Sequence, residues 1–172
     1  MIGLITKGIA KIFGTKSARD IKEILPYVDQ TNEEHAKLTS LTNDELRGQT
    51  KEVTKYIDDK LAVIDAEITA LHKKVEDNPD LDIHEKEEVF NQIDKLEETR
   101  NVELEEVLLE VLAKAFAIVK ETARRFKEND ELVVTATMHD KVMAAKHSHV
   151  ELDGENAIWQ NRWKYNDSSK GD

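Results

Sequence analysis

One stretch of the sequence decides the fold: residues 42–79 read TNDELRGQTKEVTKYIDDKLAVIDAEITALHKKVEDNP. Thr42, followed three residues later by Glu45, forms a capping-box pattern, in which each side chain bonds the other residue's backbone N–H at a helix start. Proline in Asp77-Asn78-Pro79-Asp80 marks a turn that ends the helix. Between these signals the apolar side chains recur in steps of mostly three and four, as on one face of a long helix: Leu46, Val53, Ile57, Leu61, Ile64, Ile68, Leu71 and Val75.

A second apolar stripe follows the turn: Val89, Ile93, Leu96, Leu104, Val107, Leu108, Val111, Leu112, Ala115, Phe116 and Val119. Because the turn is short, we expect an antiparallel helical hairpin whose arms each reach roughly 50–65 Å at 1.5 Å per residue. The stripe is narrow up to about Arg100 and covers a wider arc from Leu104 to Phe126. We expect this later half to be buried against something larger than one helix.

Carboxylates crowd the stretch 82–110: Asp82, Glu85, Glu87, Glu88, Asp94, Glu97, Glu98, Glu103, Glu105, Glu106 and Glu110. Two-metal helical sites use Glu-x-x-His on facing helices, and no glutamate here has a histidine three residues later. The ligand spacing of an EF-hand calcium loop is also missing. The pattern therefore indicates a solvated helix face, and we expect no metal and no cofactor in this chain.

The last third of the chain is expected to hold a small antiparallel sheet. The run 132–137 is rich in β-branched residues. The segments 150–152 and 157–159 flank Asp153-Gly154-Glu155-Asn156, a hairpin-turn sequence. Residues 138–146 are expected to connect them as a helix or a loop.

Two tryptophans and two histidines stand out near the end of the chain. Trp159 and Trp163 are interpreted as the aromatic core of a small subdomain, with anchoring on a neighbouring surface as the alternative. His147 and His149 alone are a weak metal-site signal, because no third histidine or carboxylate is evident nearby. Residues 164–172 form a polar tail without a structural signal.

The chain begins with a basic amphipathic segment. The charges of residues 1–25 sum to +3. Because the net charge of the whole chain is −11, the remaining residues carry −14. A cationic amphipathic helix can lie in a membrane interface, where anionic lipid contributes roughly 1 kcal/mol for each basic side chain. Docking on the body of its own protein is the alternative, because Gly3, Gly8 and Gly14 weaken an autonomous helix. Candidate docking residues are Ile2, Leu4, Ile5, Lys7, Lys11, Ile12 and Phe13.

Composition excludes several functional classes. The net charge of −11 argues against nucleic acid as a partner. The chain has no cysteine, which fits a reducing cytoplasm. No apolar run approaches the roughly 20 residues of a membrane span. Lys7 and Lys11 interrupt the apolar start, so we expect no signal peptide and a mature chain that begins near Met1.

Motifs of independent catalysis are missing as well. The six glycines do not form the G-x-x-x-x-G-K-[ST] loop that cradles phosphates. The sequence also contains no H-E-x-x-H and no G-x-S-x-G. We therefore expect that this chain alone is not an enzyme.

Short blocks, in their order, carry a family resemblance. The start with Ile12-Phe13-Gly14 and Lys16-Ser17-Ala18-Arg19-Asp20-Ile21-Lys22 leads into Leu41-Thr42-Asn43-Asp44-Glu45-Leu46-Arg47-Gly48-Gln49-Thr50. Ala115-Phe116-Ala117-Ile118-Val119-Lys120-Glu121-Thr122-Ala123-Arg124-Arg125 follows. This order is similar to the opening of SecA, the preprotein-translocase motor, where an L-S-D-D-E-L-R-x-x-T helix precedes an A-F-A-x-V-R-E-A-x-x-R helix. The longer stretch between the last two blocks resembles the inserted helical hairpin of Bacteroidetes-type SecA, and 132–163 resembles a second insertion of that branch.

The resemblance implies a set of roles. SecA couples ATP hydrolysis to preprotein passage through the SecYEG channel, so ATP and Mg are expected only for the full-length parent. The family's amphipathic start is associated with anionic phospholipid and SecYEG, which implies a cytoplasmic protein attached peripherally to the inner membrane. Family members continue into a nucleotide-binding fold, so we expect this chain to be a truncated piece or a fragmentary gene product. Residues implied to pack on the motor domain are Phe116, Val119, Ala123 and Phe126.

These observations predict a mainly α fold: a long antiparallel helical hairpin with a small C-terminal β subdomain. The expected division is an amphipathic helix and linker over 1–25, the hairpin over 26–128, the β-containing subdomain over 129–163 and the tail over 164–172. Without the motor domain, we expect the uncovered apolar arc to favour a homo-oligomer. A free-standing acidic coiled-coil adaptor or scaffold is the alternative function.

Overall fold

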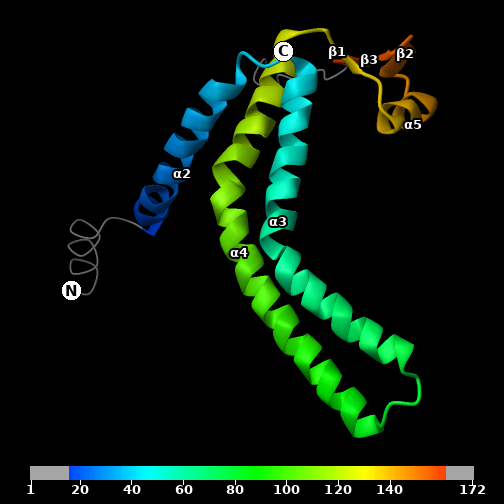
Figure 1. Ribbon diagram of the computed structural model, residues 1–172. Coiled ribbons are helices and arrows are strands. Elements are labelled where there is room, and N and C mark those ends of the chain that lie inside the picture. The colour runs from blue at the N-terminus through cyan, green and yellow to red at the C-terminus, as the bar shows by residue number, and fades with distance from the viewer. Residues whose placement is uncertain (1–15, 162–172) are drawn as a thin grey trace, which may run out of the picture.

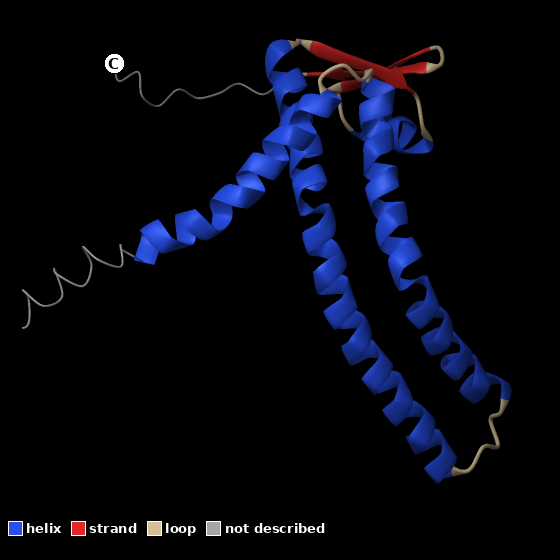
Figure 2. Ribbon diagram, turned by 60° about the vertical axis from the view of Figure 1, so that its left-hand side comes forward, coloured by secondary structure: helices blue, strands red, loops and turns tan. Residues whose placement is uncertain are grey.

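The computed structural model describes residues 16–161. Helices α3 and α4 form a long antiparallel hairpin, and the sheet and α5 lie near its open end (Figures 1 and 2). Helix α2 reaches this end with its C-terminal end and diverges from the hairpin toward its N-terminal end. The predicted mainly α fold with a small antiparallel sheet is confirmed. The elements are α2 (Lys16–Leu38), α3 (Asn43–Asp77), α4 (Ile83–Glu128), β1 (Glu131–Thr135), α5 (Met138–Lys146), β2 (Val150–Asp153) and β3 (Asn156–Gln160).

The hairpin begins where its sequence signals place it. The Glu45 backbone N–H donates to Thr42 Oγ1 at 3.2 Å, and the Thr42 N–H donates to Glu45 Oε2 at 2.7 Å. This confirms the predicted capping box. Helix α3 ends at Asp77, and α4 begins at Ile83 after an Asp82 cap. The buried seam contains Leu61 and Ile64 of α3 and Val89, Ile93, Val107 and Val111 of α4.

Helix α2 differs from the division of the chain that was predicted from the sequence. Residues 16–38 form one continuous helix, although the division placed its first part in a linker and the remainder in the hairpin. The C-terminal half of α2 packs on α4, and Leu38 joins a core cluster with Leu46 of α3 and Ile118 of α4. Most of α2 upstream of that contact is exposed. The hairpin itself therefore starts at Asn43.

The small sheet has the strand order β1-β3-β2, with both pairs antiparallel. Asp153 pairs with Asn156 at the β2–β3 turn, which confirms the predicted hairpin. Gly154 has φ 57 in this turn, a left-handed conformation that favours glycine. The connecting residues 138–146 form helix α5, one of the two expected possibilities.

The start of α3 fixes β1 in place. Asn43 Nδ2 donates to the Val133 carbonyl at 3.0 Å, and the Thr135 N–H donates to Asp44 Oδ1 at 3.0 Å. Arg47 Nη1 donates to the carbonyl of Thr135 at 3.2 Å. Three polar side chains within the first turns of α3 thus bond one strand, so the sheet is held at the open end of the hairpin.

A buried carboxylate ties α5 and β3 to the same helix. Asp140 is fully buried and accepts from Arg47 at 2.6 and 3.0 Å. It also accepts from Trp159 Nε1 at 2.9 Å and from the N–H of Thr137 at 2.8 Å. Burial favours the neutral acid, but the hydrogen bonds from Arg47, Thr137 and Trp159 outweigh it and hold the pKa of Asp140 well below its usual range. The charged pair therefore locks the subdomain onto α3.

Candidate docking surface on helix α4

Helix α4 has apolar side chains on two faces. Its inner face, which includes Val107 and Ile118, is buried in the body of the protein. The side chains of Phe116 and Val119 belong to the other face and are 59% and 65% exposed. We call this second face the outer seam and define it as Leu109, Leu112, Phe116, Val119, Ala123 and Phe126.

The structure gives different surroundings to the residues expected to pack on a motor domain. Phe116, Val119 and Ala123 are exposed in the structure. Phe126 is only half-buried and also lines an apolar groove of about 290 Å³ with Leu132 and Trp159. The expected docking residues Ile2, Leu4, Ile5, Lys7, Lys11, Ile12 and Phe13 lie outside the described part of the chain.

Behind the outer seam, a buried ionic cluster centres on Glu121. Arg124 Nη2 and Arg125 Nε donate to its Oε1 at 2.7 and 2.8 Å. His35 Nε2 lies 3.0 Å from its Oε2. The Glu121 side chain is fully buried, yet hydrogen bonding from Arg124, with help from Arg125, lowers its pKa from 4.5 to about 2.

Arg125 extends the cluster to the turn between α2 and α3. Its Nη2 donates to the carbonyls of Leu38 and Leu41 at 3.2 and 2.6 Å, and its Nη1 donates to Asn43 Oδ1 at 2.8 Å. One guanidinium thus donates hydrogen bonds to acceptors at the end of α2 and at the start of α3. This role of Arg125 was not predicted from the sequence, although the spacing of Glu121 and Arg125 by four residues is a signal for an ion pair on one helix face.

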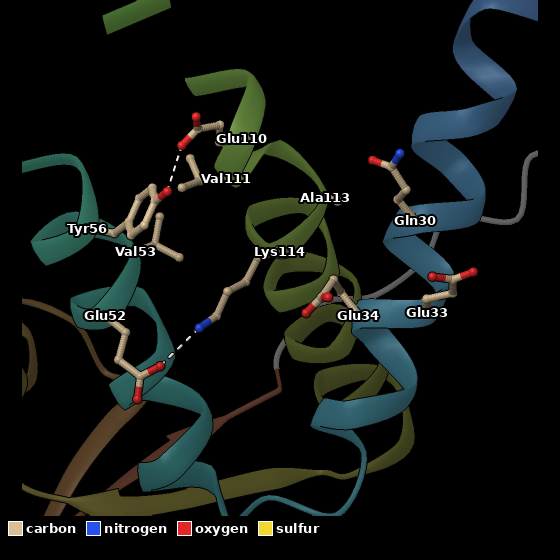
Figure 3. Close-up of a pocket in the computed structure, with 10 residues that line it drawn as sticks. All are labelled: Gln30, Glu33, Glu34, Glu52, Val53, Tyr56, Glu110, Val111, Ala113 and Lys114. Atoms are coloured by element: carbon tan, nitrogen blue, oxygen red, sulfur yellow. Dashed lines mark hydrogen bonds and ion pairs between the residues drawn. The ribbon is translucent and has the colours of Figure 1, made fainter. Parts of the chain in front are cut away.

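An open groove of about 560 Å³ separates α2 from the hairpin (Figure 3). Tyr56 Oη of α3 donates to Glu110 at 2.6 Å, and Lys114 Nζ donates to Glu52 at 3.0 Å. Dashed lines mark both contacts in Figure 3. These contacts join the two arms of the hairpin beside the groove. The lining residues are Gln30, Glu33, Glu34, Glu52, Val53, Tyr56, Glu110, Val111, Ala113 and Lys114.

Metal sites in proteins use clusters of ligand side chains such as His, Asp and Glu. Within 16–161, no three His, Asp or Glu side chains converge in an arrangement that could hold a metal ion. His147 and His149 lie with ring centroids 5.3 Å apart, and His149 also lies against Trp159. The helices of this same part of the chain include none with the length and apolarity needed to cross a bilayer. The exposed apolar side chains of the outer seam make it our functional candidate among the described residues.

Comparison with known proteins identifies a consistent set of relatives, each called protein translocase subunit SecA. The relative from Cytophaga hutchinsonii is 50% identical over 163 residues, which cover 95% of this chain. The relatives from Amoebophilus asiaticus and Parabacteroides distasonis are 46% and 41% identical over 92% and 91% of the chain. The chain spans only 14% of the length of each of these three relatives. No protein-family model and no solved structure matches the chain.

Proposed function

Because the chain belongs with the protein translocase subunits named SecA, over the 14% of their length that it matches, we propose that it serves protein translocation as their N-terminal segment. The observation that carries the proposal is the 50% identity to a SecA relative across 95% of the chain. That match extends over the hairpin and the sheet, and is not confined to short motifs. The exposed outer seam supports a segment that functions in contact with other parts of a larger protein.

The first part of the proposal is that the outer seam packs on the remainder of SecA. Large apolar side chains such as Phe116 and Val119 are exposed in this chain and would be covered by such packing. We test this by replacing both residues with glutamate in a full-length SecA that carries the segment, and measuring preprotein import into inverted membrane vesicles. The control places glutamate at Val63 and Ile83, which are exposed but lie outside the outer seam. Equal import by the two variants would contradict the docking role.

The second part concerns the basic start of the chain, which we propose to bind anionic phospholipid and the SecYEG channel from the cytoplasmic side. The charge of residues 1–25 supports it, because the rest of the chain is strongly acidic. The test compares the chain with a variant lacking residues 1–14 on vesicles of anionic or zwitterionic lipid. Binding should require anionic lipid, weaken with salt and disappear in the deletion variant. Equal binding by both chains would remove the role of this segment.

We further propose that ATP and Mg are handled by the remainder of SecA and not by this segment. The phosphate-cradling loop is missing from residues 1–172. Isothermal titration of the chain with ATP and Mg should give no binding heat, and a saturable signal would contradict the assignment.

A free-standing acidic coiled-coil adaptor is the competing function, favoured by the acidic, solvent-exposed outer surface of the hairpin. The coding sequence after Asp172 separates the two. A Walker A motif in the same reading frame supports the translocase segment, and an immediate stop codon favours the adaptor.

A further inference from the structure

The residue spacing of the outer seam indicates what kind of partner covers it. We propose that its occupant is one α-helix with acidic side chains along one edge, supplied by the remainder of the translocase subunit. The inference rests on the proposed function, because it takes the partner to lie in the rest of SecA.

The six residues of the outer seam follow one another in steps of three, four, three, four and three. This is the a/d spacing of a heptad, with Leu109, Phe116 and Ala123 at a and Leu112, Val119 and Phe126 at d. Such a row accepts knobs from one helix that crosses at a shallow angle. The seam covers residues 109–126, so a partner helix of roughly 27 Å, at 1.5 Å per residue, would fill it.

The inner face of α4 shows how the same helix already uses this spacing. Val107, Val111, Ile118 and Arg125 are buried and separated by four or seven residues. This inner row contacts helices of the same chain, since α4 packs against both α3 and α2. Helix α4 therefore carries two helix-packing rows, one occupied and one open, as the middle helix of a layered bundle does.

The side chains at the edges of the outer seam indicate which charge a partner helix carries. Lys120 and Lys127 occupy e positions on one edge, and Leu108, Ala115 and Thr122 occupy g positions on the other. Lys120 Nζ donates to Asn32 Oδ1 at 2.6 Å, a neutral group that leaves the lysine charge in place. No acidic residue occupies an e or g position between 108 and 127. A helix with Asp or Glu facing these lysines would complement the edge.

The same edge disfavours a second copy of this chain as the occupant. In an antiparallel pair of outer seams, e positions face e positions, which sets Lys120 against Lys120. In a parallel pair, the e-position lysines face Ala115 and Thr122 and gain no opposite charge. Repulsion in one arrangement and no attraction in the other favour a different helix as the partner.

Site-specific photo-cross-linking in the full-length subunit tests the proposal. A photoreactive phenylalanine derivative is placed in turn at Leu109, Phe116 and Ala123, one heptad apart, and the cross-linked peptides are identified by mass spectrometry. We expect all three positions to label a single segment, at residues about seven apart, with Asp or Glu beside them. The matched control places the probe at Val63, which is 73% exposed on α3 and should not label that segment.

A charge variant tests the edge separately. Replacing Lys120 and Lys127 with glutamate should lower the cross-linking yield from Phe116 several-fold, whereas glutamate at the exposed lysines Lys51 and Lys73 of α3 should not. An unchanged yield overturns the acidic edge.

Three other outcomes would overturn the single-helix partner. Labels on α4 of another subunit would identify a second copy as the occupant. Labels scattered over separate segments would contradict one helix but leave docking on the remainder of SecA intact. No label from any of the three positions would remove the docking role as well.

Discussion

His35 on α2 and Glu121 on α4 are 86 residues apart in sequence, and their side chains meet with Nε2 3.0 Å from Oε2. The glutamate is fully buried, while the histidine retains 16% side-chain exposure. Arg124 and Arg125 bond the same carboxylate from α4 itself. One buried negative charge with two guanidinium partners therefore contributes to the attachment of α2 to the hairpin.

Removing that charge is expected to destabilise the chain strongly. In Glu121→Gln the shape is kept, but buried Arg125 loses its counter-ion, at a cost of roughly 3 kcal/mol in the free energy of unfolding. Urea unfolding followed by circular dichroism at 222 nm measures it. The control is Glu128→Gln, which removes an exposed partner of Arg124 and should cost less than about 0.5 kcal/mol. An equal loss of unfolding free energy in the two variants would contradict a larger contribution from the buried Glu121 cluster.

Acid should weaken the same attachment. The pKa of Glu121 is lowered in the folded chain from 4.5 to about 2, so its ionised form stabilises the fold fully above pH 4.5. That contribution, roughly 3 kcal/mol at 1.4 kcal/mol per pH unit, is lost as pH falls from 4.5 through 2. The stability difference between the natural chain and Glu121→Gln should therefore shrink over this window. A constant difference from pH 5 to pH 2 would contradict the assignment.

The hairpin and the β2–β3 turn could be predicted because their signals are local. Thr42 and Glu45 cap a helix through neighbouring atoms, and Gly154 supplies the backbone conformation that its turn needs. Helix α2 was harder to predict, because Pro26 lies inside it and lacks the N–H of a helix interior. Its C-terminal half is held instead by distant partners on α4, which no local pattern reports.

The candidate docking surface could also be predicted only in part from the sequence. The expectation that Phe116 and Val119 pack on a motor domain came from a family resemblance combined with a wide apolar arc, and it stays a prediction. The division of that arc into an inner and an outer face required the fold, because either face alone could have met α3. Phe126 differs from its expected surroundings for a similar reason: the groove that it lines is completed by Leu132 of β1 and Trp159 of β3, which the sheet brings together.

The sheet and α5 should detach when the Asp140 anchor is removed. Asp140→Ala leaves Arg47 and Trp159 Nε1 without their shared acceptor, and we expect a loss of about 3 kcal/mol. The emission of Trp159 should shift to longer wavelength as its ring meets water. It is measured with Trp163 replaced by phenylalanine, so that one tryptophan reports. Glu155→Ala, an exposed change in the β2–β3 turn, should leave the spectrum unchanged, and a similar shift there would contradict a specific anchor.

Two identical substitutions on α4 distinguish its faces. Val107→Ala and Val119→Ala remove the same atoms from the same helix and raise helix propensity equally. Val107 is buried, so its variant should lose about 2 kcal/mol of unfolding free energy, whereas Val119 is 65% exposed and its variant should change by less than about 0.5 kcal/mol. Urea unfolding of residues 1–172 provides both values. If Val119→Ala proves as costly as Val107→Ala, the outer seam must be covered in the isolated chain. Sedimentation equilibrium would then distinguish pairing of two chains from contact within one chain.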